Sequence, residues 1–161
     1  MEYNGERIGA KFGEVAAAML SYGHWDHAGG LTRAFDFITH DPMLPAPRHV
    51  QEERNCKSWW RSASHGEHIP SPEELKEYGA IPVLTTDPCV ILEDMFYISS
   101  EIERVTSYEK GMSDHKSRSL DESKWEPDPL FMDERLLAVN IKDKGLVIFS
   151  AFSHAGIVNI M

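Results

Sequence analysis

The spacing of apolar residues along the chain predicts both helices and strands. The run Ala16–Leu20 favours a helix by intrinsic propensity, but it leads into a polar, histidine-rich loop, and metal-binding loops lie at strand ends in layered α/β folds. We therefore predict a buried strand over 15–21. A glycine pair follows, and then a helix is predicted over 28–39, because four apolar residues recur at helical spacing: Leu31, Ala34, Phe35 and Ile38.

A second helix is predicted where the chain reads Ser71-Pro72-Glu73-Glu74. Serine is a favoured N-cap residue, and proline is tolerated at the first helical position because its missing N–H has no partner there. The two glutamates complement the positive end of the helix dipole. This helix should continue to about Tyr78 and end at Gly79.

The second half of the chain reads mainly as strands. Apolar and β-branched runs predict strands over 81–86, 90–92 and 95–98. Two further runs, 136–141 and 146–150, flank the turn-forming residues 142–145, which is typical of a hairpin. The hairpin leads directly into a loop that carries His154.

Two polar stretches resist assignment. In 41–70, Pro42, Pro45 and Pro47 argue against regular structure early on, and the histidines at 40, 49, 65 and 68 are interpreted as surface residues. His65 and His68 have a spacing that suits a metal, but nothing else in the sequence supports that reading. The stretch 107–130 is charged and poor in aliphatic residues, so a long loop is predicted.

Composition narrows the classes of function. The 161 residues are 42% hydrophobic and carry a net charge of −10, which argues against a nucleic-acid binder, because phosphates attract Lys and Arg. No apolar run approaches the roughly 20 residues that span a bilayer, and no signal peptide is evident at the start. Two cysteines, Cys56 and Cys89, make no disulfide framework, so we expect a cytoplasmic protein. The chain has no internal repeat and no clear linker, so we expect a single domain over 1–161.

The strongest chemical signal is His24-Trp25-Asp26-His27, which follows Tyr22-Gly23. Imidazole nitrogens and carboxylate oxygens are ligands of zinc and related divalent ions. At this spacing, we expect His24, Asp26 and His27 to converge on one point from a loop, because a helix would spread them around its surface. The alternative is a polar loop with incidental histidines.

This motif resembles the metal-binding signature of the metallo-β-lactamase superfamily, His-x-His-x-Asp-His. The resemblance implies that His24 is a ligand of a first metal site, and that Asp26 and His27 are ligands of a second. Asp26 would also orient a metal-activated water and is the candidate catalytic residue. Tyr22 stands where the family has a first-site histidine, and a phenol with a pKa near 10 ligates poorly.

Two further segments resemble one branch of that superfamily, the dihydropterin–ribofuranosylaminobenzene phosphate synthases. Ser153-His154-Ala155-Gly156-Ile157-Val158-Asn159 matches its Ser-His-Ala-Gly-Ile-Val-Asn motif, and residues 99–111 match its Gly-Glu-Ile-Pro-Arg-Val-Thr-x-x-Glu-Lys-Gly segment. The three matches occur in the same order as in that branch. They imply that His154 is a first-site ligand, so its imidazole nitrogen should lie about 3–4 Å from that of His24.

The resemblance implies a metallo-β-lactamase αββα sandwich, with mixed sheets and flanking helices. Members of this branch begin with strands ahead of the first motif and continue to a later histidine that completes the second site. We therefore expect 1–161 to be an incomplete domain, truncated at both ends, with uncovered sheet edges that favour self-association. Zn²⁺ or another divalent transition metal is the implied cofactor, with at most one ion bound.

The implied function is a metal-dependent hydrolase that acts on a small molecule, in this branch a phosphorylated pterin- or aminobenzoate-type compound. In such enzymes the metal lowers the pKa of a bound water toward neutrality. Arg104, Lys110 and Lys116 are candidates to meet an anionic substrate, although a solvated polar loop explains them equally well. The alternative function is a degenerate, non-catalytic metal-binding or interaction module, or a fragment of a longer enzyme.

Overall fold

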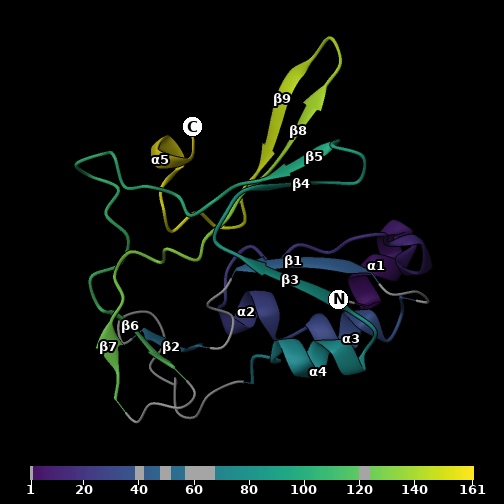
Figure 1. The fold of residues 1–161 in the computed structure, drawn as a ribbon, viewed down its shortest axis with the longest axis horizontal. Helices are drawn as coiled ribbons and strands as arrows, with labels where there is room; N and C mark the ends of the chain where they lie inside the picture. Colours follow the sequence, from purple (N-terminus) through teal and green to yellow (C-terminus); the bar gives the residue numbers. More distant parts are fainter. Residues whose placement is uncertain (1, 39–41, 48–51, 57–67, 120–123) are drawn as a thin grey trace.

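The computed structural model describes residues 2–38, 42–47, 52–56, 68–119 and 124–161 (Figure 1). Short helices are mixed with strands, which form three small sheets within these residues. The mixture agrees with the predicted α/β class. In chain order the elements are α1 (Glu2–Ile8), η1 (Phe12–Glu14), α2 (Trp25–Ala28), α3 (Leu31–Phe35), β1 (Met43–Pro47), β2 (Glu52–Cys56), α4 (Pro72–Glu77), β3 (Ile81–Thr85), β4 (Cys89–Ile91), β5 (Phe96–Ile98), β6 (His115–Ser119), β7 (Glu126–Pro127), β8 (Leu137–Ile141), β9 (Gly145–Phe149) and α5 (Ile157–Ile160).

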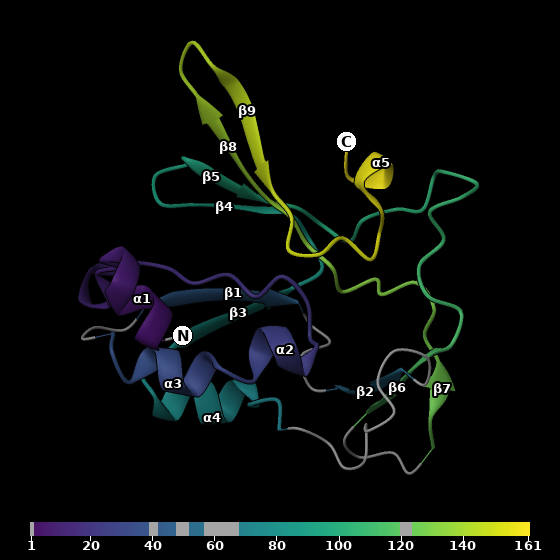
Figure 2. The same ribbon diagram turned by 180° about the vertical axis from the view of Figure 1, so that it is seen from behind.

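The first core lies where the N-terminal helices meet. In both ribbon views, α3 and α4 lie on one side of the parallel pair β1–β3, and the four-stranded sheet lies on the other (Figures 1 and 2). The predicted helical face is buried as expected, because its apolar side chains join residues from α4 and the preceding loop. This core consists of Leu20, Ala28, Leu31, Phe35, Leu75 and Ala80, with Ala18, Ile38 and Ile69 packed against it.

The second core lies beneath an antiparallel sheet of order β4-β5-β8-β9. The predicted hairpin is present, since β8 pairs with β9 from Leu137↔Phe149 to Ile141↔Gly145. Its turn needs a left-handed backbone, which Asp143 (φ 61°) and Gly145 (φ 93°) adopt. The buried residues of this core are Ile102, Leu136, Ala138, Ala155 and Ile160.

Helix α4 begins with the predicted cap. The Ser71 hydroxyl accepts a hydrogen bond from the Glu74 N–H at 3.1 Å, and the Glu74 carboxylate accepts one from the Ser71 N–H at 2.8 Å. This reciprocal pair is a capping box, which satisfies two N–H groups that have no partner within the helix. The helix ends as predicted, with Tyr78 at the C-cap and Gly79 at φ 83°.

The first predicted strand and helix differ from the structure. Residues 15–21 do not form a strand: Ala17 makes one isolated bridge, and the rest is irregular. A strand needs a partner along its length to satisfy its backbone groups, and the described residues supply it only at Ala17. The predicted helix 28–39 is two short helices, α2 and α3, separated at Gly29-Gly30. None of the helices in the described ranges is long and apolar enough to cross a membrane.

Both polar stretches contain strands that the sequence did not predict. Met43–Pro47 pairs in parallel with Ile81–Thr85 despite its prolines. The fixed φ of proline suits extended backbone, and Pro45 and Pro47 lack donors on the same edge of the strand. Within the predicted loop 107–130, β6 pairs with β2 and β7. These strands lack an apolar alternation, so periodicity could not detect them.

We predict that Ser71→Ala lowers the free energy of unfolding by about 0.5–2 kcal/mol, the usual cost of losing an N-cap. Urea denaturation followed by circular dichroism should show a lower midpoint with an unchanged slope. Ser113→Ala, at an exposed turn position, is the matched control and should leave the midpoint in place. Equal midpoints for the two variants would contradict the capping role.

Candidate functional site

The first histidine motif lies at the start of a helix. His24 occupies the N-cap of α2 in extended backbone (φ −85°, ψ 150°), and Asp26 and His27 lie within the helix. The prediction that all three project from a loop is therefore wrong. The side chains of adjacent residues in a helix point in different directions, whereas side chains three positions apart lie on the same face. His24 and His27 accordingly both contact the Tyr22 ring, at centroid distances of 4.9 and 4.0 Å.

Tyr22 and Ser21 hold the His27 imidazole from both sides. The Tyr22 hydroxyl lies 2.5 Å from His27 Nε2, and the Ser21 hydroxyl lies 2.9 Å from His27 Nδ1. Burial lowers the pKa of His27, against the opposing effect of Asp26. A neutral ring carries one proton, so the consistent arrangement is a phenol that donates to Nε2 and an Nδ1–H that donates to Ser21.

The phenol of Tyr22 stays protonated in this setting. Burial raises its pKa, and the negative charges of Asp26, Glu134 and Asp133 raise it further. Tyr22 is only 1% exposed. Because metal ligation by tyrosine requires the phenolate, Tyr22 acts here as a hydrogen-bond donor to His27.

His154 is brought to the same cluster from the loop that follows β9. Its ring centroid lies 5.2 Å from that of His24 and 5.0 Å from that of Tyr22. The two histidines are thus neighbours, although 130 residues separate them in the sequence. Burial, reinforced by nearby His115 and His27, lowers the pKa of His154 to about 4, so its imidazole is neutral at pH 7.

Phe131 separates His154 from another imidazole. The Phe131 ring stacks on His154 with centroids 4.1 Å apart and planes 2° apart, and it lies 3.8 Å from the ring of His115 at 33°. The rings of His115 and His154 are both so close to Phe131 that they would overlap if they lay on the same face of the phenyl ring. The phenyl ring therefore lies between His115 and His154.

His115 is the histidine that the sequence did not single out. It begins β6, is 1% exposed, and its Nε2 lies 3.0 Å from Nε2 of His24. Its Nδ1 lies 2.7 Å from the backbone oxygen of Asp128. His115 stands alone in a charged stretch with no motif around it, so only the fold reveals its proximity to His24.

The segment Asp133-Glu134-Arg135 ties the two histidine loops together. An Asp133 carboxylate oxygen accepts a hydrogen bond from the Gly23 N–H at 2.7 Å, next to His24. Glu134 accepts one from the Ala155 N–H at 2.5 Å, next to His154. Burial raises the pKa of Glu134. The backbone hydrogen bonds that Glu134 accepts near His154 and the charge of Arg104 act in the opposite direction. These two side chains position the loops.

Arg135 anchors that segment. Its backbone N–H donates to the Ser21 oxygen at 2.8 Å. Its guanidinium donates to the Ser99 oxygen at 2.7 Å and to the Asp87 oxygen at 3.1 Å, and it also contacts the Thr85 oxygen. Because these acceptors lie ahead of β4 and after β5, Arg135 fixes the segment to the four-stranded sheet.

The predicted ligands do not form one complete metal site. Asp26 is exposed, with a carboxylate oxygen 3.8 Å from His27 Nε2. In the described ranges, no group of three or more His, Cys, Asp or Glu side chains is arranged to hold one ion. The donor chemistry nevertheless fits a divalent transition metal, because the cluster is rich in imidazole side chains. His24 and His115 have nitrogens close enough to share an ion.

Other sequence candidates lie elsewhere. His68 is exposed, as interpreted, and its Nε2 contacts the Glu74 carboxylate at 2.9 Å. His40, His49 and His65 lie outside the described residues. Arg104 does not face an open site, since its guanidinium contacts the backbone oxygens of Ile102, Leu130 and Phe131. It therefore supports the loop that carries Phe131.

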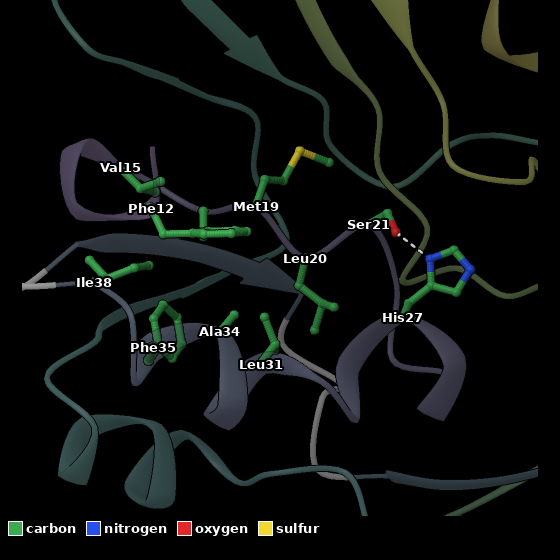
Figure 3. A pocket seen from close by; sticks show the side chains of 11 residues that line it. Phe12, Val15, Met19, Leu20, Ser21, His27, Leu31, Ala34, Phe35 and Ile38 are labelled. Atoms are coloured by element: carbon green, nitrogen blue, oxygen red, sulfur yellow. Dashed lines mark hydrogen bonds between the residues drawn. The ribbon is translucent and has the colours of Figure 1, made fainter. Parts of the chain in front are cut away.

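An apolar pocket of about 420 Å³ ends at this cluster. Figure 3 shows Phe12, Val15 and Ile38 at one end and the hydrogen-bonded pair Ser21–His27 at the other. The pocket thus combines an apolar wall with a polar end. Such a combination suits a small ligand that has an aromatic part.

Residues 105–109 and 158–159 pack against each other. The Glu109 carboxylate accepts hydrogen bonds from the N–H groups of Val158 (2.9 Å) and Asn159 (3.0 Å). Asn159 in turn accepts from the N–H groups of Val105 and Thr106. These bonds fix the position of α5 and of the loop that precedes it.

Comparisons with known proteins bear on the fold. No family model and no curated protein matches the chain. A crystal structure described as Tm1679, a metal-dependent hydrolase of the β-lactamase superfamily, superposes with a TM-score of 0.73 at 20% sequence identity. This chain therefore shares the fold of that structure. The match covers 99% of this chain and 54% of that one, so this chain spans about half the length of its structural neighbour.

We predict that Asp133→Ala destabilises the protein by about 1–3 kcal/mol, because it leaves the buried Gly23 N–H without its acceptor. Guanidinium denaturation monitored by tryptophan fluorescence measures the change. Asp114→Ala, at an exposed position, serves as the control and should alter stability by less than about 0.5 kcal/mol. A similar small effect for both would show that Asp133 does not hold the His24 loop.

Proposed function

We propose that this chain is a metal-dependent hydrolase of the β-lactamase-superfamily type, with one divalent ion, Zn²⁺ in the first instance. The observation that carries the proposal is the convergence of His24, His27 and His154 on the buried ring of Tyr22. They come from two distant parts of the chain. The fold shared with a metal-dependent hydrolase gives independent support.

A bound divalent ion supplies a Lewis acid and lowers the pKa of a coordinated water. His24 and His154 are the proposed ligands, because both are histidines of the matched motifs and lie side by side. The exposed carboxylate of Asp26 faces His27. We assign Asp26 to ligation and to orienting the attacking water, for which it can accept a proton.

The same geometry supports a site with one ion. The Tyr22 hydroxyl occupies His27 Nε2, and Phe131 covers one face of His154. A second ion would have to displace the phenol from His27. Tyr22 therefore favours a single-ion site, consistent with the limit inferred from the ligand count.

For the substrate, we propose a phosphorylated pterin- or aminobenzoate-type compound. This narrower proposal rests on the resemblance of residues 99–111 and 153–159 to the synthase branch. The pocket beside His27 supports it, because its volume and apolar wall suit an aromatic ring. Lys110, which is exposed, and Lys116 remain candidates for the phosphate, whereas Arg104 is engaged by backbone oxygens.

A non-catalytic metal-binding module is the second candidate. The observation that favours it is the hydrogen bond between Tyr22 and His27. In this alternative, the cluster binds an ion through His24 but lacks the free imidazole that a hydrolytic centre uses. The two functions differ in turnover and not in metal content.

Metal analysis provides the first test. Protein stripped with a chelator and dialysed against Zn²⁺ should retain one equivalent per chain. His24→Gln should weaken binding at least about tenfold, by analogy with the loss caused by perturbing metal-site residues. His68→Gln changes an exposed histidine and should bind like the parent. Two equivalents in the parent would refute the single-ion site, and none would refute the metal centre.

Turnover separates the two candidates. The zinc-loaded chain should hydrolyse a chromogenic phosphodiester or lactone, and Asp26→Asn should lower kcat by about 100-fold or more, since a positioned acid or base contributes 10²–10⁴. Asp114→Asn is the matched control. A zinc-loaded chain with the same slow rate in all three proteins would establish the non-catalytic alternative.

A further inference from the structure

His115 has the surroundings of a positioned metal ligand. Its side chain is fully buried, and its Nδ1 lies 2.7 Å from the Asp128 backbone oxygen and 3.4 Å from an Asp128 carboxylate oxygen. Oxygen atoms of both kinds accept hydrogen bonds, so Nδ1 carries the proton. In a neutral ring, the lone pair then resides on Nε2.

That lone pair is directed at His24. The two Nε2 atoms lie 3.0 Å apart, and the ring centroids lie 5.0 Å apart. Without an ion, His24 can donate its own Nε2 proton to His115. With an ion, both nitrogens can ligate: at bond lengths of about 2.0–2.1 Å, a separation of 3.0 Å corresponds to an angle of about 91–97° at the metal.

The support of His115 also follows the pattern of metal sites. Histidine ligands commonly donate their second ring N–H to a backbone carbonyl or a carboxylate, which fixes the tautomer and the ring orientation. Asp128 offers both groups to His115. No hydrogen bond to Tyr22 competes for His115 Nε2, in contrast to His27.

We propose that His115 and His24 together bind the divalent ion, and that His115 supplies the imidazole that Tyr22 cannot. Asp128 is the positioning residue for His115. This inference rests on the proposed metal-dependent function and names a ligand that none of the matched motifs contains. The ion is the one proposed above, because His24 neighbours both His115 and His154.

A ligand exchange with Co²⁺ tests the proposal without reference to activity. In His115→Cys, a thiolate at a ligand position gives an intense near-ultraviolet charge-transfer band with Co²⁺. His68→Cys retains the native cysteines and places a thiol at an exposed position, so it should give no additional band. His115→Gln should bind Zn²⁺ at least about tenfold more weakly than the parent, whereas His68→Gln should not.

A measurement on the unmodified chain covers the case in which the variants do not fold. Long-range ¹H–¹⁵N spectra of the histidine rings should show that the Nε2 resonance of His115, the ring whose Nδ1–H donates to Asp128, moves on addition of Zn²⁺. If the parent binds zinc while this resonance stays fixed and His115→Cys gives no band, His115 is not a ligand, and the proposed function stands. If the parent binds neither Zn²⁺ nor Co²⁺, both proposals fail.

Discussion

The hydrogen bonds of residues 131–135 are the constraint on which the candidate site depends. Asp133 accepts from Gly23, Glu134 accepts from Ala155, and the Arg135 backbone donates to Ser21. Gly23 is next to His24, Ala155 is next to His154, and the Ser21 side chain contacts His27. Because buried backbone groups must be satisfied, the two loops are held at one distance from each other. The imidazole cluster is a consequence of that bridge.

Tyr22 changes the chemistry of this cluster without opening a gap in it. A buried, protonated phenol holds the His27 ring in place, and burial lowers the pKa of His27. The hydrogen bond from Tyr22 to His27 favours candidate metal chemistry at His24 over His27. There the neighbouring imidazoles are His154 on one side of Phe131 and His115 on the other.

The sequence predicts an element correctly where a single short-range interaction determines the local structure. The capping box at Ser71, the hairpin at 142–145 and the helical face of Leu31 each reflect a short-range rule of backbone or side chain. The strands β1 and β6 could not be predicted, because their prolines and charged residues do not give the apolar alternation of a strand. Their pairing also depends on partners far along the chain.

The site was predictable only in part for a related reason. The motifs indicated His24, Asp26, His27 and His154, and the structure places His24 beside His154. The local backbone differed, since α2 starts at Trp25 and separates Asp26 from His24. No sequence pattern marks His115, because its significance arises from a contact across 91 residues.

The bridge by Asp133 also has a consequence for the order of folding. Its bond to Gly23 closes a loop of 110 residues, and the His24–His115 contact closes one of 91. Contacts so distant in sequence are entropically costly to form and slow folding relative to local ones. The helix α4 and the hairpin β8–β9 have only local closures, so they can form first. We therefore expect the imidazole cluster to assemble late, so that hydrogen-exchange protection of the Gly23 N–H should report completion of the native state.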